Sequence, residues 1–508
     1  MASPGQIKVL TFNTWGLPLA SKDDKLRLRM QADYFRQSGK TLDIVLLQEV
    51  WTDEYVTLLK DAAAESGLVH ATTFDGGVLG AGLLVLSRFP FTDVAFRPYT
   101  VRGEPGALQG EAMAGKGIGY ARVQLPYGGR CTTLHLFNTH THANWVHSVT
   151  PDAQLSDVKV PTDTFAPYRT ANILEAVSFM KPIVVAAAAA GELVLAGGDW
   201  NVPADNLEAA LILELLPGLR DAWQLAGHGA LDPAGNTCGD PSNVYTGSII
   251  GGYVPERIDF LWTNSSRVLE CETVLKIMPG TSLNYSDHFG VRGIISCEVT
   301  STESAVMALA RAGIFPQQRS ASGDAGDAVA MGGWGPTGGN INGRDRQASA
   351  AAAPSLPRSS PCDSPIILAP PGPVAESKIT PDPGDGDSVG PTGRKPSRRV
   401  RLLQLALAQL RAGMDATNVG QTRLLRRTLL FAAVTLVAIA VQLYGIIAET
   451  DHWAKRLAAA VAVVVAPVAL GLCLFQVAWM SMGTAGRRGF GQLMRMVEVW
   501  EKVARADE

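Results

Sequence analysis

Two long apolar runs near the end of the chain constrain its folding more than any other feature. Residues 429–448 and 457–482 contain no charged side chain. Each run is close to the ~20 residues that a helix needs to cross a hydrocarbon layer of ~30 Å. The alternative is a pair of buried helices in a soluble core, but the runs are too long and too uniformly apolar for an amphipathic pattern. We therefore predict a transmembrane hairpin within residues 429–482.

Basic residues around the two runs predict how the hairpin is oriented. Arginines flank its outer ends, whereas the short connection mixes acidic and basic side chains; the flanking residues are Arg423, Arg426, Arg427, Arg487 and Arg488. Because cytoplasmic segments carry an excess of Lys and Arg, both outer ends should face the cytosol. We expect an integral membrane protein with a cytosolic tail over 483–508. The first residues lack the pattern of a secretory signal, and the endoplasmic reticulum and mitochondria are the membranes we expect.

The composition changes sharply between about residue 301 and the hairpin. Residues 301–397 are rich in Ala, Gly, Pro, Ser and Asp and poor in aromatic and branched apolar side chains, which predicts a disordered linker. From residue 398 to about 420, apolar side chains at Val400, Leu403, Leu407 and Leu410 fall on one helical face behind a cluster of arginines. This pattern predicts a basic amphipathic segment, with a soluble helix as the alternative.

Residues 1–300 alternate short apolar runs typical of strands with helical stretches. The strand-like runs cover residues 7–12, 44–48, 83–87, 134–139 and 193–196. This alternation predicts a layered α/β domain. The six cysteines lie without metal-ligand or disulfide-framework spacing, which indicates reduced thiols in a cytosol-facing protein. A net charge of −3 argues against a protein that coats nucleic acid, although it does not exclude a nuclease.

Polar clusters follow several of these runs, with the residue types that phosphodiester chemistry uses. That chemistry needs charge neutralisation on phosphoryl oxygens, an activated water and a proton for the leaving oxygen. Taken singly, each cluster is more typical of a turn or a helix start than of a site. A zinc site at His140 and His142 is the competing idea, but no Cys or carboxylate completes a compact ligand set there. The clusters lie at 13–16, 48–49, 137–142, 197–201, 257–261 and 286–288.

In this order, the clusters resemble the endonuclease/exonuclease/phosphatase superfamily of Mg²⁺-dependent phosphoesterases, over roughly residues 6 to 298. The resemblance implies a four-layered α/β sandwich of the DNase I-like type, with the site at one edge of its two sheets. It also implies that Glu49 is the principal Mg²⁺ ligand, with Asn13 and Asp287 beside the metal. Mn²⁺ is expected to substitute for Mg²⁺. The number of metal ions stays open.

The same resemblance implies roles for the remaining residues. His288 would be the acid/base histidine, oriented by Asp259. Asp199 would align the attacking water or take its proton. Asn201 and Asn13 would contact the phosphate, and His140 would stabilise the charge that develops on phosphoryl oxygen.

Two departures from the nuclease pattern point to one branch of the superfamily. Nucleases commonly carry an acid two residues after the first Asn, where this chain has Trp15. The segment 13–18 instead resembles the opening motif of the neutral sphingomyelinase and inositol phosphosphingolipid phospholipase C branch. The segment 111–117 resembles the loop whose lysine, here Lys116, approaches the lipid phosphate. Some members have an aspartate in place of Glu111, and the acid and lysine are thought to exchange partners during activation.

The branch implies a function that also agrees with the membrane hairpin. We expect Mg²⁺-dependent, phospholipase C-type hydrolysis of a sphingolipid in the membrane, releasing ceramide and a phosphorylated headgroup. Anionic phospholipids are expected activators, since each basic residue near such a surface contributes about 1 kcal/mol. No nucleic-acid partner is expected. The alternatives are an inositol-phosphate phosphatase, a membrane-tethered nuclease of the same superfamily, or a catalytically silent scaffold; the intact set of site residues argues against the last. Headgroup preference and oligomeric state stay open.

Overall fold

The computed structural model describes most of the chain outside the predicted linker. The described residues are 5–18, 21–77, 79–103, 111–127, 130–144, 153–155, 158–246, 254–299, 396–447 and 452–506. All of them belong to one compact unit. The linker predicted over 301–397 lies outside the described residues, apart from its last two positions.

The first of two six-stranded sheets is built around β1. Strand β1 (Gln6–Asn13) pairs antiparallel with β14 (Gly290–Ser296) and parallel with β2 (Ile44–Gln48). Every residue of β2 is buried, as expected of a central strand that is covered on both faces. The full order is β13-β14-β1-β2-β4-β3, with β13 at Val268–Val274, β4 at Leu84–Ser87 and β3 at His70–Thr73.

The second sheet has the order β11-β12-β10-β7-β6-β5. At its centre, β10 (Leu193–Asp199) runs parallel to β7 (Arg130–His140) and antiparallel to β12 (Asp259–Thr263). The remaining strands are β5 (Phe91–Pro98), β6 (Gly117–Tyr127) and β11 (Arg220–Asp221). A short hairpin of β8 (Ala153–Leu155) and β9 (Val158–Val160) lies outside both sheets.

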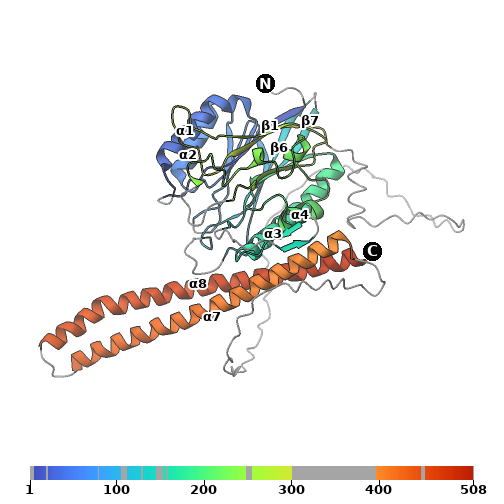
Figure 1. Ribbon diagram of the computed structural model, residues 1–508. Coiled ribbons are helices and arrows are strands. Elements are labelled where there is room, and N and C mark those ends of the chain that lie inside the picture. Colours follow the sequence, from blue (N-terminus) through green and yellow to red (C-terminus); the bar gives the residue numbers. More distant parts are fainter. Residues whose placement is uncertain are drawn as a thin grey trace, which may run out of the picture. The chain divides into compact units, whose positions relative to one another are not determined.

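Three apolar cores stack these elements into four layers (Figure 1). One core lies between the sheets and joins side chains such as Leu46 and Leu195. A second covers the outer face of the first sheet with α1 (Asp24–Ser38) and α2 (Asp53–Glu65). A third covers the second sheet with α3 (Ala166–Ala190) and α4 (Leu207–Leu215). The short elements η1 (Gly39–Thr41), α5 (Ala222–Leu225) and η2 (Pro233–Gly235) connect them. This is the α/β sandwich that the sequence predicts.

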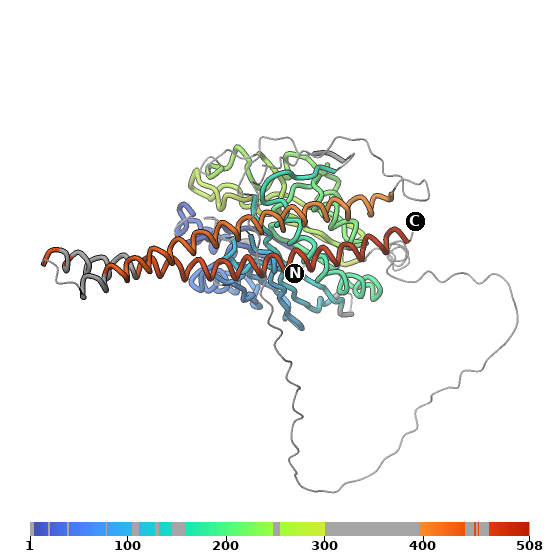
Figure 2. Tube along the Cα trace, turned by 90° about the horizontal axis from the view of Figure 1, so that it is seen from below, coloured from blue at the N-terminus to red at the C-terminus, as the bar shows by residue number. Residues whose placement is uncertain are grey.

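Two long helices follow, α7 (Arg398–Ile447) and α8 (His452–Ala506), and they lie side by side in both views (Figures 1 and 2). The predicted segment 398–420 and the described part of the predicted tail, residues 483–506, are therefore continuous with the apolar runs as helix. Helix α7 continues through Gly413. A Cβ at this position would lie 2.5 Å from the Phe490 ring, so the close packing of Phe490 favours glycine there.

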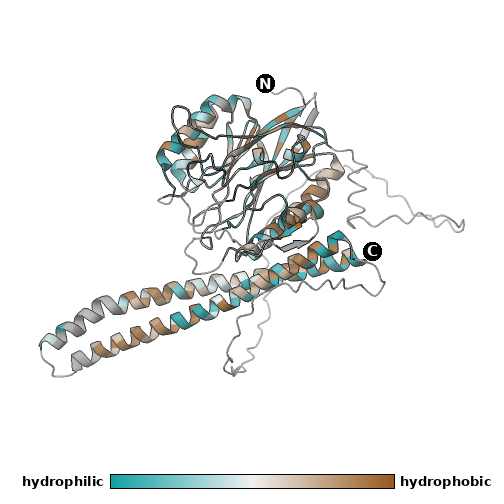
Figure 3. Ribbon diagram, viewed as in Figure 1, coloured by the Kyte–Doolittle hydropathy of each residue, from teal (hydrophilic) through white to brown (hydrophobic). Residues whose placement is uncertain are grey.

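Stretches of α7 and α8 are strongly hydrophobic in sequence (Figure 3), and many of their large hydrophobic side chains are exposed. Leu436 is 67% exposed on α7 and Leu474 is 62% exposed on α8. Such a surface is unfavourable in water and suits a hydrocarbon environment. Both helices are long and apolar enough to cross a membrane by length and composition. Helix α3 meets the same test, but half of its apolar 18-residue window is buried inside the protein.

Candidate active site

The predicted site residues converge where strands of both sheets end. Asn13 is the last residue of β1 and His140 the last of β7. The register of the second sheet places Asp199 between His140 on β7 and Asp259 on β12. Parallel strands end at the same sheet edge, which is why clusters that are distant in sequence meet here.

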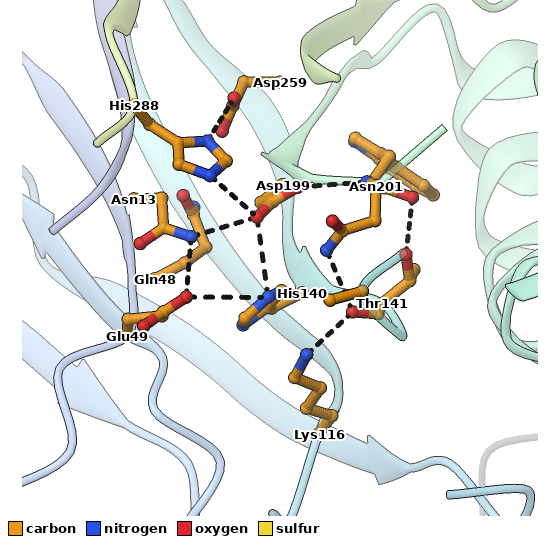
Figure 4. Close-up of polar contacts among 12 residues, drawn as sticks. Asn13, Gln48, Glu49, Lys116, His140, Thr141, Asp199, Asn201, Asp259 and His288 are labelled. Carbon is orange, nitrogen blue, oxygen red and sulfur yellow. Dashed lines mark hydrogen bonds and ion pairs between the residues drawn. The ribbon is translucent and has the colours of Figure 1, made fainter. Parts of the chain in front are cut away.

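The Asn13 side chain joins the two sheets at this edge (Figure 4). Its Nδ2 donates hydrogen bonds to Oε1 of Glu49 at 3.0 Å and to Oδ2 of Asp199 at 2.9 Å. Its Oδ1 accepts a hydrogen bond from the backbone N–H of Trp15. Asn13 is fully buried, so its amide holds the two carboxylates at a defined separation.

His140 lies between the same two carboxylates. Its Nε2 is 3.5 Å from Oδ2 of Asp199 and 4.0 Å from Oε1 of Glu49. Burial, and next the charge of Lys116, lower the pKa of His140 well below its usual 6.5. A neutral imidazole can donate one hydrogen bond to a phosphoryl oxygen without adding a fixed positive charge.

His288 has the opposite electrostatic character. Its Nδ1 lies 2.9 Å from Oδ2 of Asp259, and its Nε2 lies 3.9 Å from Oδ2 of Asp199. Burial by itself lowers the pKa of His288, but Cys238, Asp259 and Asp199 together raise it well above 6.5. A raised pKa favours the imidazolium form of the ring, which can give up a proton.

Asp199 is positioned by an unusual piece of backbone. Burial, and next the charge of Asp259, raise the pKa of the Asp199 carboxyl. Its Oδ1 accepts a hydrogen bond from the N–H of Asn201, a residue with φ of +50°. The preceding Gly198 has φ of +146°, and a Cβ there would lie 2.1 Å from the Thr139 carbonyl oxygen. Glycine is required at this position.

Glu49 and Asp287 form the oxygen-rich side of the site. Burial, and next the charge of Asp287, raise the pKa of Glu49. Burial likewise raises the pKa of Asp287. Both carboxylates are partly buried, and two such groups near one another are stabilised by a cation. With the Oδ1 atom of Asn13 they offer the hard oxygen ligands that Mg²⁺ prefers. The residues thus fit a divalent metal.

A second group could also hold a metal ion by proximity alone. Ligand atoms of Asp199, Asp259 and His288 all lie within 4.8 Å of one another in the part of the chain that the structure describes. The hydrogen bond between His288 and Asp259 fits the predicted proton-transfer roles of these residues instead.

Lys116 reaches the site from β6 and its preceding loop. Its Nζ donates to Glu111 at 2.9 Å and to the carbonyl oxygen of Thr141 at 3.0 Å. The same carbonyl accepts from Nδ2 of Asn201 at 3.1 Å, so Lys116 and Asn201 share one acceptor. Burial raises the pKa of Glu111, but the ammonium of Lys116 and its other partners lower it overall, so the two groups form a buried ion pair.

Some residues that organise the site were assigned no role from the sequence. Gln48 donates from Nε2 to Oδ1 of Asn138 at 2.8 Å, which ties the two sheets together beneath Asn13. Arg27 on α1 donates to the carbonyl oxygens of Thr14 and Trp15 and holds the turn after β1. Gln48 stands beside a predicted ligand, but no motif marks Arg27.

Comparison with known proteins agrees with this geometry. The model of the Endonuclease/Exonuclease/phosphatase family matches residues 10–288. The inositol phosphosphingolipids phospholipase C of Schizosaccharomyces pombe is 27% identical over 321 residues, which cover 58% of this chain and 69% of that protein. A protein described as a putative neutral sphingomyelinase, from Caenorhabditis elegans, is 28% identical over 310 residues, 56% of this chain and 66% of its own. Among solved structures, sphingomyelinase C from Streptomyces griseocarneus aligns over 57% of this chain and 99% of its own, at 20% identity and a TM-score of 0.39. The sequence matches confirm the predicted resemblance, including its branch.

Proposed function

The chain belongs to the Endonuclease/Exonuclease/phosphatase family, and from that premise we propose that it hydrolyses the phosphodiester of a membrane sphingolipid. The products are ceramide and a phosphorylated headgroup. The observation that carries the proposal is the Asn13 amide, which hydrogen-bonds to both Glu49 and Asp199. The Oδ2 atom of Asp199 lies 3.5 Å from Nε2 of His140 and 3.9 Å from Nε2 of His288. The curated relatives bear names of enzymes that act on inositol phosphosphingolipids and sphingomyelin.

The residues divide the reaction between them. Asp199 accepts a proton from the attacking water as that water forms a bond to phosphorus. His288 gives its Nε2 proton to the ceramide oxygen as the bond from phosphorus to that oxygen breaks. His140 donates a hydrogen bond to a phosphoryl oxygen, and Lys116 and Asn201 contact the phosphate.

We propose Mg²⁺, or Mn²⁺ in its place, as the cation held by Glu49, Asn13 and Asp287. When bound, the ion neutralises charge on the phosphoryl oxygens. The donor set supports this assignment, because carboxylate and amide oxygens suit a hard cation better than a softer metal.

Membrane attachment through α7 and α8 completes the proposal. A lipid substrate stays in the bilayer, so an anchor keeps the enzyme at a high effective concentration near it. We place the sandwich on the cytosolic side of the endoplasmic reticulum or mitochondrial membrane. The arginines that border the apolar runs within α7 and α8, including Arg426 and Arg487, would attract anionic phospholipids.

The experiment measures headgroup release from sphingomyelin and from inositol phosphorylceramide in mixed micelles with Mg²⁺. Wild type is compared with Glu49→Ala and His288→Ala. We expect Mg²⁺-dependent release that both substitutions abolish, and the preferred lipid identifies the headgroup. If the wild type releases neither headgroup, even with anionic phospholipid, the proposal fails and inositol phosphates and nucleic acids become the substrates to test.

A further inference from the structure

A stack of aromatic rings lies behind the Lys116–Glu111 pair. The ring of His142 stacks with the rings of both Phe165 and Tyr168, with centroids 5.2 Å apart in each pair. The next backbone N–H, that of Ala143, donates to Oε1 of Glu111 at 3.3 Å. The place of the His142 ring therefore influences where Glu111, and through it Lys116, is held.

The stack continues into the C-terminal helix α8. The centroid of the Phe490 ring lies 5.6 Å from that of Tyr168 at an angle of 62°, and Phe490 is fully buried. A Cβ added at Gly413 of α7 would lie 2.5 Å from the Phe490 ring and 2.7 Å from Pro167. Phe490 is therefore confined between α7 and the start of α3, where a smaller side chain would leave a void.

A second line of contacts joins the same helix to the same pocket. A Cβ added at Gly489 would lie 2.9 Å from both Thr100 and Val101. The carbonyl oxygen of Val101 accepts from Nδ2 of Asn172 at 2.7 Å. The Asn172 Oδ1 in turn accepts from the backbone N–H of His142 at 3.0 Å. Gly489 and Phe490, which are adjacent in α8, are thus each linked to His142 through a different set of contacts.

A third contact lies on the same face of α8. Trp479 precedes Phe490 by 11 residues, about three helical turns, which places the two side chains on one face. Trp479 packs in a small apolar cluster with Leu424 of α7 and with Ala112 and Met113 of the Lys116 loop. One face of helix α8 therefore contacts both the loop, through Trp479, and the aromatic stack, through Phe490.

Resting on the proposed function, we propose that Phe490 is a positioning residue for catalysis. Through Tyr168 and His142, it holds the Glu111–Lys116 pair at the site. The helix that bears the membrane anchor is then part of the catalytic framework and does more than tether the domain. The competing explanation is that Phe490 only docks the sandwich against the two helices.

A substrate that dissolves without a membrane can distinguish a positioning role of Phe490 from a purely docking role. We would use a short-chain analogue of whichever sphingolipid the wild-type protein hydrolyses, kept monomeric, and compare it with vesicles of the long-chain lipid. The full-length variants are Phe490→Ala and Phe490→Leu. Leu403→Ala is the control, because Leu403 is buried in the same apolar core on α7 and contributes nothing to the aromatic stack described above.

We expect Phe490→Ala to lower kcat on the monomeric substrate about 10-fold, since a small misplacement of a catalytic group is costly. KM should change less, Phe490→Leu should restore most of kcat, and Leu403→Ala should lower the melting temperature with less than about a 2-fold change in kcat. Loss on vesicles alone, or an equal loss of kcat in Leu403→Ala, would overturn the proposal.

A double-mutant cycle provides a measurement that does not depend on stability. If Phe490 acts through Lys116, Phe490→Ala should add little to the loss already caused by Lys116→Ala. Full additivity of the two losses would contradict the inference. A wild-type protein that hydrolyses neither lipid form would instead contradict the proposed function itself.

Discussion

The Nδ1 atom of His288 lies 2.9 Å from Oδ2 of Asp259. Burial alone would lower the pKa of His288, but Asp259 is among the groups that raise it well above 6.5. Burial and the charge of Asp259 raise the pKa of Asp199 on the other side of the ring. A deprotonated Asp199 and a protonated His288 are the forms that the proposed reaction requires.

The opposite protonation states required of Asp199 and His288 predict a bell-shaped pH dependence of kcat/KM. Activity should rise as Asp199 loses its proton and fall at higher pH as His288 loses its own. In Asp259→Asn, one cause of the raised His288 pKa is removed, so the alkaline limb should move to lower pH. The profile of Asp61→Asn, an exposed residue of α2 outside the site, serves as the control. An alkaline limb that does not move would show that His288 is not the acid.

The carboxylates of Glu49 and Asp287 lead us to predict how activity depends on Mg²⁺. We expect Glu49→Gln to raise the Mg²⁺ concentration for half-maximal activity by at least about 10–100-fold, with Asp287→Asn weaker in effect. Added Mg²⁺ should also raise the melting temperature of the wild type, because a ligand that binds the folded state stabilises it. Glu54→Gln, an exposed position on α2, should behave as wild type. An unchanged Mg²⁺ requirement in Glu49→Gln would remove Glu49 from the metal site.

We predict that Gly198→Ala lowers both the stability and the activity of the protein. An alanine there would place Cβ 2.1 Å from the Thr139 carbonyl oxygen and would displace Asp199. Gly191 is the matched control, since it also has positive φ, +67°, but nothing lies within 4 Å of an added Cβ. Gly191→Ala should cost about 1 kcal/mol of unfolding free energy, measured in urea, with normal kcat. Equal effects of the two substitutions would argue against a steric requirement at Gly198.

The C-terminal helices predict a hairpin with both ends in the cytosol. A glycosylation acceptor placed in the connection between α7 and α8 should be modified in microsomes, whereas one placed after residue 508 should not. Extraction at alkaline pH should leave the full-length protein in the membrane fraction. Modification of the C-terminal acceptor would reverse the proposed orientation, and release by alkali would exclude a spanning hairpin.

The positions of five strands, among them the central β1, β2, β7 and β10, and of the polar clusters were predictable because they depend on local pattern. Apolar runs such as 44–48 form strands because buried central strands are continuously apolar, and Glu49 follows directly. Helix ends were less predictable. The segment 398–420 continues into the first apolar run as one helix, because no residue in it stops helical hydrogen bonding.

The sequence by itself determined the α/β class, the apolar C-terminal pair of helices and the polar clusters to which we assign the chemistry, since each is encoded in short stretches of side-chain type and spacing. Only the tertiary structure decided which groups meet. The Asn13 amide bonds to Asp199 across 186 residues, and that contact depends on strand register in two packed sheets. The same is true of Arg27 beneath Trp15 and of Phe490 behind His142 and Tyr168. Such contacts arise from packing over long sequence separations, which no local pattern records.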